Sequence, residues 1–238
     1  MKKLYIKNEL AFSLLWIGIY IVSLSAADGI SIDLGIEKVL TAPLCLVLSG
    51  FLYIWISKMN LKQVYGLVYP HISLKSILYY IPLVLIVSVN LWSGVQLNYT
   101  ILESILYVIS MICVGFLEEI IFRGFLFKVL AKDNLKHAII ISSVTFGIGH
   151  IVNLLNGADL IPTLLQIAYA VSAGYLFTIL FHTTGSLIPC IVTHSLLNSL
   201  SAFTVEQSAL MDYCSAIFLM IVPLCYAWYI QRYTKRPQ

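Results

Sequence analysis

The chain is 238 residues long; 60% of its residues are hydrophobic, 11% are charged, and the formal net charge is +3. Because an ordinary soluble domain carries roughly 25% charged residues, this composition excludes that class and predicts an integral membrane protein. Each membrane span needs about 20 residues, so we predict one integral membrane domain over residues 1–238 and no second folded domain. The lipid bilayer is the expected partner. The small positive balance gives no reason to propose nucleic acid.

Hydropathy along the chain predicts about eight apolar helices, which makes the fold class an all-α, polytopic transmembrane helix bundle. The fourth helix is longer than a bilayer requires, so its last turns are expected to leave the membrane at the cytoplasmic interface. In chain order, the predicted helices cover residues 10–27, 39–56, 76–92, 101–131, 138–153, 161–181, 188–203 and 211–230.

Positive charges gather at alternate ends of these helices, while the other ends carry only Lys38 together with most of the acidic residues. Cytoplasmic ends of membrane helices are enriched in Lys and Arg, so both termini are predicted to be cytoplasmic. With such short loops, the pattern favours a multi-pass protein of a prokaryotic plasma (cell) membrane. The cations at the predicted cytoplasmic ends are Lys2, Lys3, Lys7, Lys58, Lys62, Lys75, Lys128, Lys132, Lys136, Arg232, Lys235 and Arg236.

A cleavable signal peptide is the alternative interpretation of the first helix. Three lysines precede its apolar stretch, which ends near Ser25-Ala26-Ala27. The apolar run is longer than the usual core of a signal peptide, roughly 7–15 residues, and a retained helix preserves the alternation of charge. We therefore favour retention of the first helix.

Two adjacent glutamates and an arginine, Glu118, Glu119 and Arg123, interrupt the apolar run at residues 101–131. An ionisable residue at bilayer depth persists only if it faces protein or water and meets a partner, so it indicates a functional site. The i,i+4 spacing places Glu119 and Arg123 on one helix face, whereas Glu118 projects about 100° away. We expect Glu119 to be paired with Arg123 and Glu118 to be free.

The same i,i+4 spacing recurs in Phe146 and His150 and again in His194 and Asn198. At about 1.5 Å per residue, Glu119 and His150 lie roughly 18 Å from the cytoplasmic ends of their helices and His194 about 12 Å. Three helices can therefore present polar residues to one centre. We expect a common cavity that opens to water on the cytoplasmic side.

Three motifs stand in order: Glu118-Glu119-Ile120-Ile121-Phe122-Arg123-Gly124, Phe146-Gly147-Ile148-Gly149-His150 and His194-Ser195-Leu196-Leu197-Asn198. Together with Thr184-Gly185-Ser186-Leu187, this pattern resembles the CPBP family of intramembrane proteases. That family includes CAAX prenyl endopeptidases of the Rce1 type and bacterial Abi proteins linked to bacteriocin processing and self-immunity. The resemblance covers a catalytic core at residues 101–201.

The resemblance implies a hydrolase that cuts a peptide bond in a membrane-associated peptide or protein tail. The substrate classes it implies are CAAX-type tails and bacteriocin or signal-peptide leaders. Position by position, it implies that Glu118 activates a water with help from His150, while His194 and Asn198 stabilise the oxyanion. Supporting roles fall to Glu119, Arg123 and Phe146.

The resemblance leaves metal dependence open, because the family is often described as metalloproteases. A divalent metal such as zinc would be held by Glu118, His150 and His194. These ligands come from three helices, without the His-Glu-x-x-His spacing that places two ligands and a base on one helix. We favour a mechanism without a tightly bound metal.

Two non-enzymatic functions are alternatives. A catalytically silent immunity or partner-binding membrane protein of the same fold would keep the motifs. A small proton-coupled transporter would also need buried Glu and His, but the paired repeats typical of transporters are absent from the sequence. The sequence leaves the oligomeric state open.

Overall fold

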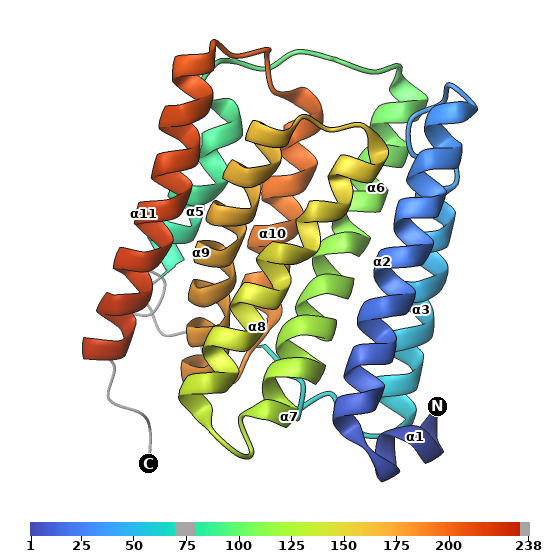
Figure 1. Cartoon of the computed structure of the whole chain (residues 1–238), viewed down its shortest axis with the longest axis vertical. Coiled ribbons are helices and arrows are strands. Elements are labelled where there is room, and N and C mark those ends of the chain that lie inside the picture. Colours follow the sequence, from blue (N-terminus) through green and yellow to red (C-terminus); the bar gives the residue numbers. More distant parts are fainter. Residues whose placement is uncertain (70–79, 234–238) are drawn as a thin grey trace.

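A computed structural model describes residues 1–69 and 80–233 and confirms the all-α bundle (Figure 1). The start of the third predicted helix, at residues 76–79, and the cations Lys75, Lys235 and Arg236 lie outside the described residues. The α-helices are α1 (Lys2–Lys7), α2 (Glu9–Asp33), α3 (Thr41–Lys58), α5 (Ile81–Ser88), α6 (Ile101–Glu118), α7 (Lys128–Leu130), α8 (Leu135–Gly149), α9 (Leu160–Thr184), α10 (Ile188–Leu200) and α11 (Ala209–Tyr233).

Four shorter helical segments extend these helices. The 3-10 turns η2 (Val89–Leu91), η4 (His150–Asn156) and η5 (Ser201–Phe203) continue α5, α8 and α10. A nine-residue π-helix, η3 (Glu119–Phe127), joins α6 to α7, so that the three form one continuous rod. A π-helix is rare and is found mostly at functional sites. Here it starts at the second glutamate of the first motif.

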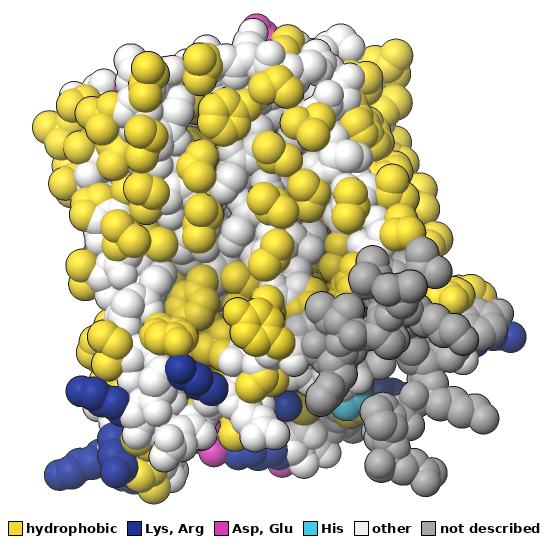
Figure 2. Space-filling view, turned by 180° about the vertical axis from the view of Figure 1, so that it is seen from behind, with side chains coloured by type: hydrophobic (Ala, Val, Ile, Leu, Met, Phe, Trp, Pro, Cys, Tyr) yellow, Lys and Arg dark blue, Asp and Glu magenta, His cyan; other side chains and the backbone are white. Residues whose placement is uncertain are grey.

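Six helices of the described chain are long and apolar enough to cross a membrane, which identifies a multi-pass membrane protein. Two further apolar helices, Ile81–Leu91 and Ile188–Phe203, are shorter. The surface of the bundle also supports a location in the membrane, because large apolar side chains are exposed over most of its height (Figure 2). Leu14, Val47 and Val84 are examples of such exposed side chains. In water this surface would be unfavourable, whereas lipid tails cover it. Each of the eight predicted windows contains a helix.

The two ends of the bundle differ in charge. Helix α1 and the last turn of α11 lie at the same end (Figure 1), and Lys and Arg side chains gather there (Figure 2). We call this the basic end and define it by Lys2, Lys3, Lys7, Lys58, Lys62, Lys128, Lys132, Lys136 and Arg232. The opposite end carries the α2–α3 loop and the loops that follow η2, η4 and η5.

An aromatic cluster fills the bundle just inside the basic end. The ring of Phe125, on η3, lies 5.1 Å from that of Phe12 on α2 and 5.0 Å from that of Tyr65 in the loop after α3. Trp55 stacks on Phe12 at 5.0 Å. All of these rings except Trp55 are almost fully buried. Within the described residues, these closely packed rings lie between the basic end and the bundle centre.

Close contact between α6 and α10 depends on Gly115. A Cβ at this position would collide with the side chain of Ser195 and would lie 2.8 Å from its backbone nitrogen. The hydroxyl of Ser195 also donates to the carbonyl oxygen of Ile112 at 3.2 Å. Small residues let membrane helices approach closely, and here that approach brings His194 against the two glutamates.

Candidate active site

The carboxylate of Glu118 is held by two helices other than its own. The Tyr20 hydroxyl, on α2, donates to Oε1 of Glu118 at 2.6 Å. The Nε2 atom of His194, on α10, lies 3.2 Å from Oε2, within ion-pair range but without hydrogen-bond geometry. Glu118 is the last residue of α6 and is 8% exposed. The prediction that Glu118 is free is therefore wrong, because Tyr20 and His194 both reach it.

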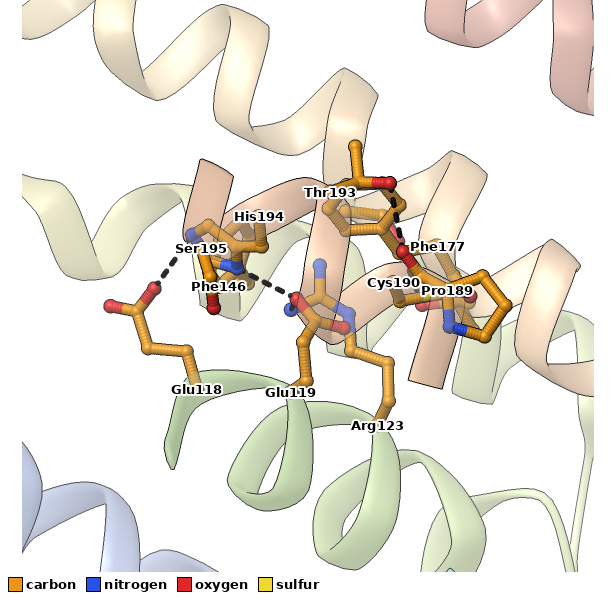
Figure 3. A network of polar contacts seen from close by, with 12 residues as sticks. Glu118, Glu119, Arg123, Phe146, Phe177, Pro189, Cys190, Thr193, His194 and Ser195 are labelled. Carbon is orange, nitrogen blue, oxygen red and sulfur yellow. Dashed lines mark hydrogen bonds and ion pairs between the residues drawn. The ribbon is translucent and has the colours of Figure 1, made fainter. Parts of the chain in front are cut away.

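His194 lies between the two glutamates (Figure 3). Its Nδ1 atom is 2.9 Å from Oε1 of Glu119, while its Nε2 atom faces Glu118. The imidazole thus links the two glutamates, through a hydrogen bond with Glu119 and a contact in ion-pair range with Glu118.

Glu119 and Arg123 form the predicted ion pair, with Nη1 of Arg123 3.1 Å from Oε1 of Glu119 and both side chains 0% exposed. The guanidinium lies 4.0 Å from the ring centroid of Phe146 and 5.8 Å from that of Phe177. Gly174 makes room for it, because a Cβ there would lie 2.9 Å from Nη2. The buried cation on two aromatic faces balances Glu119 without reaching water.

One cavity of about 400 Å³ unites five of the predicted residues in its wall: Glu118, Phe146, His150, His194 and Asn198. Glu119 and Arg123 lie behind this wall. His150 begins η4, and its Nδ1 atom lies 3.2 Å from the carbonyl oxygen of Phe146. Within residues 1–69 and 80–233, no hydrogen bond joins the His150 ring to either glutamate. The predicted convergence on one cavity is thus present in the structure.

The cavity opens toward the end opposite the basic end. Away from Glu118, its wall continues to Asp28 in the last turns of α2, Lys38 in the α2–α3 loop and Asn156 at the end of η4. Toward the basic end the wall ends at Phe122 and Phe177. The prediction of a cavity open at the basic, cytoplasmic end is therefore wrong. Buried aromatic rings fill that side, which helix periodicity could not indicate.

The donors present do not fit a zinc site as they are arranged. The Nδ1 atom of His194 contacts Glu119, and its Nε2 atom lies 3.2 Å from Oε2 of Glu118. The His150 Nδ1 atom faces the Phe146 carbonyl. Throughout the described part of the chain, no cluster of three His, Cys, Asp or Glu side chains has metal-binding geometry.

Sequence reasoning missed Tyr20, whose partner Glu118 lies 98 positions away. One feature could have indicated it. Tyrosines of membrane helices concentrate at the two interfaces, where the hydroxyl reaches water. Tyr20 instead lies near the middle of α2 and is buried, so its hydroxyl needs a partner inside the bundle.

The middle of the chain matches a known family. Residues 100–200 match the family model described as type II CAAX prenyl endopeptidase Rce1-like, and this segment contains Glu118, His150, His194 and Asn198. A search of curated proteins and a search of solved structures gave no match. The family resemblance of the three motifs is confirmed. Residues 100–200, somewhat less than half of the chain, are therefore similar to the Rce1-like family of type II CAAX prenyl endopeptidases, a family of membrane proteases.

Proposed function

We propose that the protein is an intramembrane endopeptidase that hydrolyses a peptide bond with a water activated by Glu118. The observation that carries this proposal is the placement of Glu118 beside His194 in the wall of a cavity of about 400 Å³, with Tyr20 fixing the other carboxylate oxygen. A general base must be within reach of the proton it abstracts and must be held in place; the cavity beside Glu118 has room for a water, and the contacts with Tyr20 and His194 support a fixed position of the carboxylate.

The proposed reaction runs in two steps. Glu118 takes a proton from water, and the resulting hydroxide attacks the peptide carbonyl carbon. The C–N bond then breaks, and the same proton passes from Glu118 to the leaving amine. Asn198 is suited to stabilise the oxyanion, because its amide donates hydrogen bonds without carrying a charge. Since both nitrogens of His194 face carboxylates, we assign the second oxyanion donor to His150.

Glu119 and Arg123 act indirectly in this proposal. Their ion pair is fully buried, and Glu119 holds Nδ1 of His194, so the pair sets the orientation and charge of the ring that faces Glu118. Phe146 packs against both Arg123 and His194. Its ring lies under the guanidinium of Arg123, and the ring centroids of Phe146 and His194 are 5.7 Å apart. Residues of this kind position the reacting groups.

Cleavage of a fluorogenic peptide library tests the proposal. The library should hold lipidated tails and leader-type peptides, and the purified protein should be studied in nanodiscs beside Glu118→Gln. Cleavage by the wild type alone supports the protease. The alternative is an immunity or partner-binding protein of the same fold, which would cleave no peptide. Its cellular phenotype would also survive Glu118→Gln, and that pair of results would overturn the proposal.

Removing Tyr20's hydroxyl should lower the catalytic rate. In Tyr20→Phe the carboxylate of Glu118 loses a hydrogen bond of the charge-assisted kind, worth about 1.5–3 kcal/mol. We expect kcat to fall at least about tenfold while KM changes little, because Tyr20 acts on the base and leaves most of the cavity unchanged. Steady-state kinetics will measure both. Tyr213→Phe, on the exposed surface of α11, is the matched control, and equal kcat values for the two variants would contradict the assignment.

Chelators should leave the activity unchanged. We propose a metal-free mechanism, supported by the arrangement of the His, Cys, Asp and Glu side chains, among which the described residues contain no three-ligand metal cluster. After prolonged incubation with 1,10-phenanthroline and dialysis, kcat/KM should match that of the untreated enzyme. A loss that zinc restores would show that Glu118, His150 and His194 rearrange to bind metal. Metal analysis of the purified protein before treatment provides the control.

We also propose that the protein resides in a prokaryotic plasma membrane with its basic end in the cytoplasm, and that the first helix is retained. The charge difference between the two ends supports the orientation. The packing of α2 supports retention, since it supplies Tyr20 to Glu118 and Phe12 to the aromatic cluster.

A further inference from the structure

The residues that line the cavity extend from Glu118 toward the end of the bundle opposite the basic end. On α6, Tyr107, Met111 and Val114 line the cavity on the side of Glu118 that faces away from the basic end. Their spacing from Glu118 of 11, 7 and 4 residues places all of them on one helix face. The stripe therefore forms a continuous wall from the carboxylate to the opposite end of the bundle.

The other helices around the cavity repeat this pattern. On α2 the wall begins at Tyr20 and continues through Leu24 to Asp28, again at intervals of four residues. The α9 wall runs from Phe177 back to Gln166, toward the start of that helix. Helices α2 and α9 run in opposite directions (Figure 1), yet the lining residues on both lead from the site to the same end of the bundle.

Toward the basic end, buried aromatic side chains of the same helices lie beyond the cavity. Below Tyr20 on α2 follow Trp16 and Phe12, which are 3% and 0% exposed. Phe181 on α9 is 1% exposed, and Phe125 on η3 lies against Phe12. A second hollow at the basic end stops at this aromatic layer and does not include Glu118 or either site histidine in its lining. Among the described residues, the cavity at Glu118 is thus lined toward the end opposite the basic end and bounded by buried aromatic rings on the other side.

The mouth of the cavity is polar and almost neutral. Lys38 pairs with Asp28 at 2.8 Å, and the hydroxyl of Thr41 also donates to Asp28. Burial alone would lower the pKa of Lys38, but Asp28 and Glu37 outweigh it and raise the pKa above its usual value. Lys38 therefore stays charged and keeps the ion pair intact across the physiological pH range.

Side-chain amides complete the mouth. Asn153 donates to Gln166 at 2.8 Å, and Asn156 accepts from Ser25 at 3.2 Å, so both lie on the lining of the opening. An amide offers the donors and acceptors that a peptide backbone needs. A long isoprenoid chain would meet unfavourable polar groups at this rim, whereas the wall between the rim and Glu118 also carries apolar side chains such as Leu24, Met111 and Val114.

From these observations we infer that the cavity is loaded from the side of the membrane opposite the cytoplasm, and that its substrates are unlipidated peptide segments exposed on that side, such as exported leaders. The inference rests on the proposed function, because only a protease would bind these peptides as substrates. It also rests on the assignment of the basic end to the cytoplasm. It replaces a cytoplasmic prenylated tail as the expected substrate class.

Thiol labelling in intact bacterial cells tests the direction without any need for activity. The labelling experiment starts from a variant in which the two exposed cysteines, Cys214 and Cys225, have been replaced. The other three cysteines of the chain are buried. Met111→Cys reports on the cavity wall. The matched control is Ile112→Cys, the next residue, whose side chain is 51% exposed on the lipid-facing surface. A membrane-impermeant maleimide reaches only thiols that contact water on the side where it is added.

Two further variants fix the orientation. Asp33→Cys marks the end opposite the basic end, and Lys58→Cys marks the basic end; both positions are exposed. We expect Asp33→Cys and Met111→Cys to react in intact cells, and Lys58→Cys to react only after permeabilisation. Met111→Cys should react at least about tenfold faster than Ile112→Cys, because a thiol in lipid does not ionise. Labelling of Met111→Cys only together with Lys58→Cys, or no labelling from either side, would overturn the inference.

A cleavage assay in oriented vesicles then tests the substrate class. Peptides cleaved in nanodiscs are added to right-side-out and to inverted membrane vesicles. We expect cleavage in the right-side-out vesicles only, and an unlipidated peptide should be cut at least as well as its prenylated form. Cleavage confined to inverted vesicles, or to prenylated peptides, would overturn the inference. If no peptide is cleaved even in nanodiscs, the proposed function fails, while the labelling result still decides which side the cavity faces.

Discussion

Replacing Glu118 with Gln is expected to reduce kcat for peptide cleavage by at least about 100-fold, the usual contribution of a positioned general base. The amide cannot take a proton from water. It keeps the size of the glutamate and can still accept the hydrogen bond from Tyr20, so the fold should be unchanged. Steady-state kinetics in nanodiscs will measure the effect, with the unfolding temperature of each variant as the test of folding.

Glu206→Gln is the matched control for this substitution. Glu206 is exposed in the loop before α11 and lies outside the lining of the cavity. Its activity should equal that of the wild type. If Glu118→Gln kept more than about one tenth of the wild-type kcat, Glu118 would not be the general base. The pairing with His194 would then be structural.

Arg123→Met should destabilise the protein by roughly 3–5 kcal/mol, the cost of breaking a buried ion pair. Glu119 would remain buried with only His194 to balance its charge. The double variant Glu119→Gln/Arg123→Met removes both charges and should recover a large part of the loss. Thermal unfolding in detergent, followed by tryptophan fluorescence, will rank the three proteins.

The chain offers a natural comparison for this experiment. Lys132 and Glu9 form an ion pair at 2.6 Å, but their side chains are 60% and 32% exposed. Water screens such pairs, so Lys132→Met should cost no more than about 1 kcal/mol. Equal unfolding temperatures for Arg123→Met and Lys132→Met would show that the buried pair contributes nothing special to stability.

Local patterns in the sequence predicted most of what local forces determine. Each apolar window contains a helix, and the i,i+4 spacing of Glu119 and Arg123 gave their ion pair correctly, even though the backbone there is a π-helix. The convergence of His150, His194 and Asn198 with Glu118 followed from spacing and depth alone. Hydropathy and helical repeat depend on neighbouring residues, which is why a single sequence reveals them.

Features that depend on distant contacts could not be predicted in this way. Tyr20 belongs to a segment outside the three motifs, and its role depends on the packing of α2 against η3. The direction in which the cavity opens depends on which side chains fill the bundle above and below the site. Phe12, Phe125 and Tyr65 come from three separate segments, and no periodic pattern within any one of them indicates that they meet.

The aromatic layer beneath Glu118 makes the reaction chamber blind-ended. A polypeptide cannot be threaded through it from one side of the membrane to the other. In the proposed protease, both fragments of a cut peptide would leave by the opening through which the substrate arrived. Such a chamber would favour one defined cut in a short segment over progressive degradation.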